Sequence, residues 1–268
     1  MKKILLILSL ILSTSALRAQ CTQEITAFQN GEFLTYDLYY NWSFIWVKAG
    51  SASMSTVKSV FRGHPSYRTS LVTRGNNRLD DFFVLRDTLL CYVTEECQPL
   101  YFRKGAREGD RYTVDEVFYE FKNGKCLIHQ HYINRHGTHR NKDKESTYCI
   151  FDMMSMLMRA RNFNPKGWKK GYQIAFPMAD GDDIYDCKLI YRGTDTYKMD
   201  NTGKKFRCLV LSFMQKEDGK DREIVRFYVT DDDNHIPVRL DMFLRFGSAK
   251  AFLNGYKGLR NPLDALMK

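Results

Sequence analysis

Apolar and polar side chains alternate along the first clear element of the chain, which begins at Gly31. The apolar members all have the same parity: Leu34, Tyr36, Leu38, Tyr40 and Trp42. Because successive side chains of a strand point to opposite faces, this period of two predicts a β-strand with one apolar face. Similar segments, rich in Tyr, Phe, Val and Thr and separated by Gly, Pro or Asn turns, recur along the chain. Strands at this even spacing favour an antiparallel meander that curls into a barrel or sandwich.

The segment from Cys149 to Phe163 breaks this rhythm. It consists of good helix formers without alternation, and Asn164-Pro165 follows it. It therefore predicts a helix near 149–163. We expect an all-β single domain over 31–268, with two antiparallel β subdomains at about 31–148 and 165–268, each a curved sheet or half-barrel, bridged by this short helix.

The first twenty residues have the pattern of a secretory signal peptide. Lys2 and Lys3 are basic, residues 4–12 are apolar, and the small residue Ala19 precedes the expected cut. The apolar run is too short to span a bilayer. We therefore expect an exported, periplasmic protein whose mature chain begins with a lead-in over 21–30.

Cys21 lies next to the expected cut, so a lipoprotein anchor at Cys21 is the alternative. Lipoprotein signals place a small residue directly before the cysteine and an aliphatic residue three positions before it, whereas this chain has Gln20 and Arg18 there. We therefore expect a mature N-terminus without acyl chains. No later run approaches the roughly 18 apolar residues of a membrane helix, so no transmembrane segment is expected.

The chain carries a formal net charge of +10 and is 14% aromatic. A positive balance favours contact with a lipid or another acidic envelope component, such as acidic headgroups or anionic glycans. Because the chain is predicted to be exported and its basic residues are scattered, we do not expect nucleic acid as a partner.

The chain has seven cysteines and no C-x-x-C pair. A zinc knuckle or a thioredoxin-like site is therefore not indicated. In an oxidising compartment some cysteines can pair, but spacing does not define the connectivity. The cysteines are Cys21, Cys91, Cys97, Cys126, Cys149, Cys187 and Cys208.

Four short motifs occur in a fixed order along the chain. They are the G-E-x-L-x-Y-x-L-x-Y-x-W strand from Gly31 to Trp42 followed by Val47-Lys48-Ala49-Gly50, the D-x-x-S-x-x-x-R pattern of Asp152, Ser155 and Arg159, the strand Lys205-Phe206-Arg207-Cys208, and the closing segment from Tyr228 to Leu253. Together they resemble an exported Gram-negative family catalogued as domain of unknown function 3108. This resemblance implies an all-β fold of two curved sheets or half-barrels, distantly related to the periplasmic lipoprotein carriers, and it implies no particular activity.

The densest polar cluster consists of Asp231, Asp232, Asp233 and Asn234, and Pro237 follows it closely. Clustered carboxylates can bind calcium, but the glycine and distal glutamate of an EF-hand are missing. Asp and Asn readily cap their own backbone between strands, so we expect a hairpin turn. Arg239 is expected to pair with one of these acids.

Four of the six histidines lie close together: His129, His131, His136 and His139. On a strand, His129 and His131 share a face, and such a group can bind zinc or copper. The flanking basic residues Arg135, Arg140 and Lys142 oppose a bound cation, and no carboxylate that would orient a ring is evident nearby. We therefore expect an exposed basic hairpin, and neither a metal nor a cofactor.

A period of 3.6 residues centres the inward face of the helix on Leu157, with Met153, Met154 and Ala160 around it. Arg161 is then at the edge of this face, within reach of a strand-end carboxylate or an acidic headgroup. Methionine side chains fill cores and also line adaptable apolar binding surfaces. The helix is therefore predicted to face an apolar space shared by both strand runs.

The leading functional hypothesis is a non-catalytic binding or carrier-like protein for an apolar or amphipathic envelope component. Its candidate ligand-binding residues are Trp42, Trp46, Met153, Met154, Leu157, Arg161 and Arg239. One alternative is an enzyme acting on cell-envelope glycan or lipid, for which the residues of interest are Asp152, Arg159, Asp232 and Arg239. Another alternative is an interaction subunit of an envelope assembly. A polar cleft that gathers the four enzyme candidates would favour catalysis.

Overall fold

The structure is a computed structural model that describes residues 21–42, 45–76, 84–199, 202–244 and 247–267. The predicted signal peptide lies outside the described residues, as does the side chain of Trp42.

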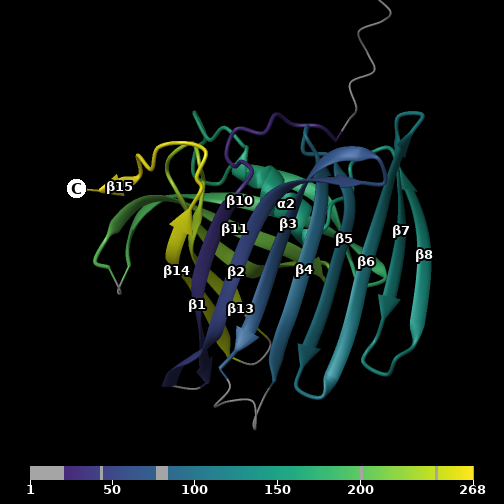
Figure 1. The fold of residues 1–268 in the computed structure, drawn as a ribbon, viewed down its shortest axis with the longest axis horizontal. Coiled ribbons are helices and arrows are strands. Elements are labelled where there is room, and N and C mark those ends of the chain that lie inside the picture. The colour runs from purple at the N-terminus through teal and green to yellow at the C-terminus, as the bar shows by residue number, and fades with distance from the viewer. Residues whose placement is uncertain (1–20, 43–44, 77–83, 200–201, 245–246, 268) are drawn as a thin grey trace, which may run out of the picture.

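The described residues form one antiparallel sheet of fifteen strands and a short helix (Figure 1). The strands are β1 (Glu32–Trp42), β2 (Ile45–Phe61), β3 (His64–Gly75), β4 (Leu85–Thr94), β5 (Pro99–Glu108), β6 (Arg111–Lys122), β7 (Lys125–Ile133), β8 (His139–Ser146), β9 (Gln173–Asp180), β10 (Asp183–Lys198), β11 (Lys205–Glu217), β12 (Lys220–Thr230), β13 (Pro237–Phe243), β14 (Ser248–Lys257) and β15 (Leu266–Met267). The helix is α2 (Met153–Arg161).

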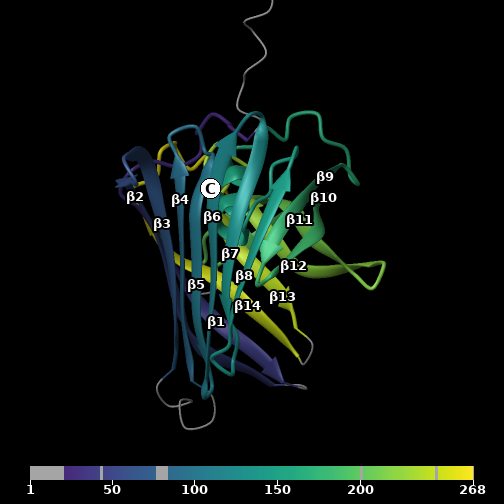
Figure 2. The same ribbon diagram turned by 90° about the vertical axis from the view of Figure 1, so that its right-hand side faces the viewer.

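Each strand run predicted from the sequence is a meander, and the two meanders meet where β1 pairs with β14. The strand order is β8-β7-β6-β5-β4-β3-β2-β1-β14-β13-β12-β11-β10-β9, with β15 added beside β11. The wall of β2–β8 curves so that it faces the strands of the second run, and α2 lies between them near one end (Figures 1 and 2). This confirms the predicted all-β fold of curved antiparallel sheets. The division into subdomains at 31–148 and 165–268 stays a prediction.

The sheet does not close, because β8 and β9 are its two ends and do not pair. Side chains connect these ends instead. Lys142 Nζ donates to the carbonyl of Asp182 at 2.7 Å, and Gln130 Nε2 donates to the carbonyls of Gly181 and Asp183 at 3.1 and 3.0 Å. The fold is therefore a half-barrel whose two ends are held together by polar contacts with the β9–β10 turn.

The helix is shorter at both ends than the predicted 149–163, and its caps explain why. Asp152 is the N-cap: its carboxylate accepts from the backbone of Met154 and Ser155 at 2.9 and 2.7 Å. Ser155 completes a capping box by accepting from the Asp152 backbone. Asn162 caps the other end, and its side chain donates to the Met158 carbonyl at 2.8 Å. The cap residues therefore limit the helix to fewer residues than its helix-forming composition predicts.

The predicted inward face of the helix is wrong by part of a turn. Met153 is 37% exposed and Leu157 is only partly buried, whereas Met154 and Met158 are at most 2% exposed. The N-cap explains this rotation, because Asp152 is fully buried and holds the first turn with its Met154 side toward the core.

The prediction that the helix faces both strand runs is confirmed. Met154 and Met158 join a core cluster that draws on both runs, including Val117 from the first and Val238 from the second. Met156 belongs to a separate cluster with Phe176 of β9 and other residues of the second run. The helix therefore fills the space between the two meanders with packed side chains.

Candidate functional site

Four buried polar residues lie at the end of the half-barrel that contains α2. We call them the polar hub: Glu32, Arg161, Asn162 and Asn234. All of them are at most 9% exposed. They come from the start of β1, the C-terminal end of the helix and the β12–β13 corner.

Arg161 is the centre of the polar hub. Its two terminal nitrogens donate to the two carboxylate oxygens of Glu32 at 2.5 and 2.8 Å. It also donates to the backbone carbonyls of Ala27 and Asn234. Burial on its own would lower the pKa of Arg161, but the adjacent Glu32 carboxylate outweighs it, so the pKa is raised. Of the two partners expected for Arg161, the strand-end carboxylate is therefore the one observed.

The polar hub also fastens the lead-in to the helix. Asn162 Oδ1 accepts from the backbone N–H groups of Thr26 and Ala27 at 2.7 and 2.9 Å. A disulfide joins Cys21 to Cys149, with the two Cα atoms 5.5 Å apart. The other five cysteines are buried and free. This end of the half-barrel is thus tied by covalent and polar contacts between distant parts of the sequence.

The acidic corner between β12 and β13 is a turn whose side chains bind its own backbone and the C-terminal segment. Asp232 accepts from Thr230 Oγ1, from the Asn234 backbone and from the Ala265 backbone at 2.8, 3.0 and 3.1 Å. The expected pairing of Arg239 with this corner is wrong. Arg239 instead donates to Asp241 at 2.7 and 2.8 Å, because residues two apart on a strand share a face.

The four residues considered for catalysis do not share a cleft. Asp152 caps the helix and accepts from Tyr119 Oη at 3.0 Å, and burial raises its pKa. Arg159 donates to the Cys21 carbonyl at 3.0 Å. Asp232 lies in the corner turn, and Arg239 pairs with Asp241 further along β13. The arrangement that would have favoured an enzyme is therefore not formed.

The predicted ligand-binding residues are likewise spread over the molecule. Trp46 is 42% exposed, with Lys250 Nζ 4.3 Å from its ring centroid. Met153 is exposed, Met154 and Arg161 are buried, and Leu157 packs at the margin of the core. Of these side chains, those that the structure describes do not line a shared hollow.

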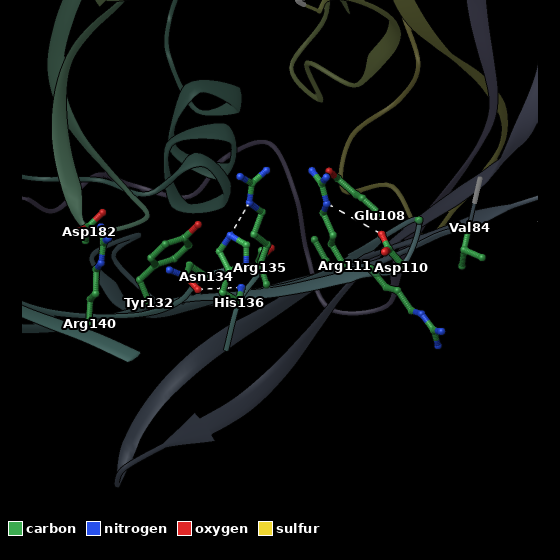
Figure 3. Close-up of a pocket in the computed structure, with 14 residues that line it drawn as sticks. Val84, Glu108, Asp110, Arg111, Tyr132, Asn134, Arg135, His136, Arg140 and Asp182 are labelled. Carbon is green, nitrogen blue, oxygen red and sulfur yellow. Dashed lines mark hydrogen bonds and ion pairs between the residues drawn. The ribbon is translucent and has the colours of Figure 1, made fainter. Parts of the chain in front are cut away.

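A groove lies at the opposite end of the half-barrel from α2, where the β5–β6 and β7–β8 turns lie (Figures 1 and 3). Its volume is about 1190 Å³. Its charged lining consists of four arginines, three carboxylates and one histidine: Arg107, Arg111, Arg135, Arg140, Glu108, Asp110, Asp182 and His136. Arg111 and Arg135 both line the groove, and their side chains project on the same side of the sheet (Figure 3).

The arginines of the groove differ in how closely they are paired. Arg140 is 3.1 Å from Asp182. The Arg111–Asp110 contact is longer, at 4.0 Å, and both side chains are more than half exposed. Arg135 Nε donates to the His136 ring at 3.0 Å. Arg111 and Arg135 are therefore less closely paired with a carboxylate than Arg140 is, and their guanidinium groups can bind an anion that enters the groove.

The wall next to the groove contains buried polar groups of the first strand run. Asp115 is 5% exposed and accepts from the Gly181 backbone at 2.9 Å, while its other carboxylate oxygen has no protein partner. Burial raises the pKa of Asp115 to about 7. Burial also raises the pKa of Asp87 on β4, to about 6. Thus the concave wall is apolar beside the helix and polar near the groove.

Sequence reasoning missed this groove. In the sequence, Arg135 and Arg140 were considered only as basic residues that flank the histidines. Arg107 and Arg111 were considered only as part of the scattered basic charge. The sequence feature that could have revealed the groove is that Arg107 and Arg111 lie on either side of one predicted turn, and Arg135 and Arg140 on either side of another. Recognising them as neighbours requires knowing that the β5–β6 and β7–β8 turns lie at the same end of one sheet.

An antiparallel half-barrel with a buried polar hub at one end and an arginine-lined groove at the other defines an all-β, barrel-like class of protein. The family model described as "Protein of unknown function (DUF3108)" matches residues 35–254, so the chain belongs to this family. This confirms the family predicted from the four motifs.

Among solved structures, the chain is similar to a β-barrel-like protein of domain of unknown function DUF1849 from Brucella abortus. The TM-score is 0.55 at 13% sequence identity, and the match covers 87% of this chain and 98% of that one. At this identity the likeness shows the fold alone. No curated protein matches the chain. In the part of the chain that the structure describes, no helix is long and apolar enough to cross a bilayer.

Proposed function

We propose that this chain is an exported, non-catalytic binding protein for an amphipathic envelope component, and that the groove receives the acidic headgroup of that component. The observation that carries the proposal is a groove of about 1190 Å³ whose lining includes the guanidinium groups of Arg111 and Arg135. Guanidinium groups form strong, charge-assisted hydrogen bonds with phosphate and carboxylate oxygens.

The disulfide supports the exported location. Disulfides persist in oxidising compartments such as the bacterial periplasm. Because Cys21 is bonded to Cys149, its sulfur is not available for the thioether of a lipoprotein anchor. The pairing therefore supports export of an unacylated chain, in line with the signal-peptide pattern.

The packing around α2 restricts where the ligand binds. The buried methionines of the helix fill the space between the strand runs, so the apolar part of the ligand does not occupy the region first predicted for it. Binding at the groove leaves that apolar part outside the core, for instance in a membrane from which the headgroup protrudes.

Vesicle binding tests this proposal with the mature chain. We expect sedimentation with phosphatidylcholine vesicles that contain phosphatidylglycerol, and none with phosphatidylcholine alone. The double variant Arg111→Gln/Arg135→Gln should bind about 30-fold more weakly, since each basic residue near an acidic surface contributes about 1 kcal/mol.

The matched control is Arg68→Gln/Arg74→Gln. It removes the same charge from two exposed positions of β3 that do not line the groove. Equal losses in both double variants would show that general surface charge, not the groove, attracts the vesicles. Failure of the native chain to bind acidic vesicles would overturn the proposal and favour the interaction-subunit alternative.

A further inference from the structure

Two histidines of the β7–β8 hairpin face each other on the side of the sheet opposite to the groove wall. His131 Nε2 lies 3.0 Å from His139 Nδ1, and the ring centroids are 5.2 Å apart. His131 Nδ1 lies 2.8 Å from Glu116 Oε2 on β6. Since the ionised carboxylate can only accept, His131 Nδ1 bears the proton, and the lone pair of His131 Nε2 accepts from His139 Nδ1.

The structure removes both objections that the sequence raised against a metal at these histidines. Arg135 lines the groove and donates to His136. Arg140 and Lys142 occupy alternate positions of β8 from His139, so they project from the other face and contact Asp182 and Asp183. The carboxylate that seemed to be missing is Glu116. It comes from the neighbouring strand, where it lies directly opposite His131 in the register.

We propose that His131 and His139 bind a divalent transition-metal ion, with Cu²⁺ the best fit, through His131 Nε2 and His139 Nδ1. An ion about 2.0–2.1 Å from each nitrogen would subtend an angle of about 90° across the 3.0 Å separation. This is the angle between neighbouring ligands of a square-planar or tetragonal site, the geometry of Cu²⁺ and Ni²⁺.

Binding requires one proton shift and a rotation of both rings. In the metal-free pair, His139 Nδ1 donates its proton to His131 Nε2. When the ion binds, His139 moves that proton to its own Nε2, and both rings turn outward so that their lone pairs converge on the ion. No group is oxidised or reduced, and no net proton is released. Water completes the coordination, since the described residues contain no group of three or more protein ligands.

Glu116 acts as a positioning residue for this site. It holds His131 in the tautomer that offers Nε2, as carboxylates do for metal-binding histidines. Glu116 is itself held by Tyr101 Oη at 2.6 Å and by Arg103 at 3.5 Å. In the metal-free chain, the orientation of His131 is therefore set by a hydrogen-bonded network that spans β5, β6 and β7.

Titration of the mature chain with copper(II) sulfate, followed by calorimetry and electron paramagnetic resonance, tests the proposal. We expect one Cu²⁺ per chain, with hyperfine splitting from two imidazole nitrogens. His131→Gln and His139→Gln should each weaken binding at least tenfold and remove one nitrogen from the spectrum. Glu116→Gln should weaken binding about 10- to 100-fold while the spectrum still reports two nitrogens.

The control is His64→Gln, an exposed histidine at the start of β3, which should leave copper affinity unchanged. His139 is exposed to solvent, and thermal melting of His139→Gln would confirm that this variant folds. Copper affinity that is the same in the native chain and in the double variant His131→Gln/His139→Gln would overturn the proposal, as would a spectrum without two-nitrogen coordination.

Discussion

At the scale of single residues, Arg161 shows how a charged side chain on a helix can be part of the core. Its guanidinium group is fully buried, and its donors contact Glu32 and the carbonyls of Ala27 and Asn234. A buried charge is tolerated only when its partners replace the lost water. Arg161 therefore orients the lead-in, β1 and the corner turn around the helix, and it is not available to a ligand.

Removing the negative partner should strongly destabilise the fold. We expect Glu32→Gln to lower the free energy of unfolding by about 3–5 kcal/mol, because it leaves the Arg161 charge buried without a counter-ion. Urea denaturation measures this loss. The control is Glu95→Gln, which breaks the exposed Lys58–Glu95 pair and should change stability by less than about 1 kcal/mol. Similar small effects for both variants would contradict the role assigned to Arg161.

Asp115 predicts a specific pH dependence of stability. Burial raises its pKa from 3.8 to about 7, so between these pH values the folded state holds a proton that the unfolded state has released. This contribution to stability is fully present below about pH 4 and is lost as the pH rises through 7. Asp115→Asn should reduce the fall in stability between pH 5 and 7 by up to about 1.4 kcal/mol per pH unit.

Denaturant titrations at several pH values measure the dependence for the native chain and Asp115→Asn. Asp87, whose pKa is raised to about 6, contributes in the same direction and remains in both proteins. The difference between the two slopes therefore belongs to Asp115. Parallel slopes would show that the Asp115 carboxyl is already ionised in the folded state at pH 5.

At the scale of elements, α2 shows how capping sets the orientation of a helix. With a period of 3.6 residues, the methionines of α2 are distributed over more than one side of the helix. Periodicity alone therefore defines the buried face of the helix poorly. The buried Asp152 cap and the Arg161–Glu32 pair hold both ends of α2. These contacts direct Met154 and Met158 into the core and leave Met153 at the surface.

The orientation of the helix predicts contrasting effects for two methionines of the same element. Met158→Ala should cost about 2–5 kcal/mol of stability, because it removes a fully buried side chain and leaves a cavity. Met153→Ala should change stability by less than about 0.5 kcal/mol, since Met153 is 37% exposed. Thermal or urea unfolding of both variants measures the contrast, and a larger loss for Met153→Ala would show that the helix is rotated.

At the scale of the whole molecule, the two ends of the half-barrel differ in the contacts that connect distant parts of the chain. Around α2, the disulfide and the polar hub connect the lead-in, the helix and the second strand run. At the groove, the contact between the runs is made by side chains of β7 and β8 with the β9–β10 turn. The groove therefore lies at the end of the half-barrel that the disulfide and the polar hub do not connect.

The disulfide predicts both stability and processing of the mature chain. Cys21 and Cys149 are 128 residues apart, and losing a bridge that closes a long loop costs about 2–5 kcal/mol. We expect Cys21→Ser to lower stability by this amount, and thiol titration of the unfolded native chain to count five free cysteines.

Metabolic labelling with a fatty-acid probe should give no signal, and incorporation that disappears in Cys21→Ser would contradict the unacylated N-terminus.

The sequence by itself determined the local structure and the family. The alternation from Leu34 to Trp42, the helix-forming segment around Met156 and the Asx-rich corner at Asp232 depend on residues close together in the chain, so their patterns can be read directly. Only the tertiary structure decided the partners of Arg161, the pairing of Cys21 with Cys149, and the groove that Arg111 and Arg135 both line. Each of these joins segments that are distant in sequence, and their proximity depends on sheet curvature and strand order, which no local period encodes.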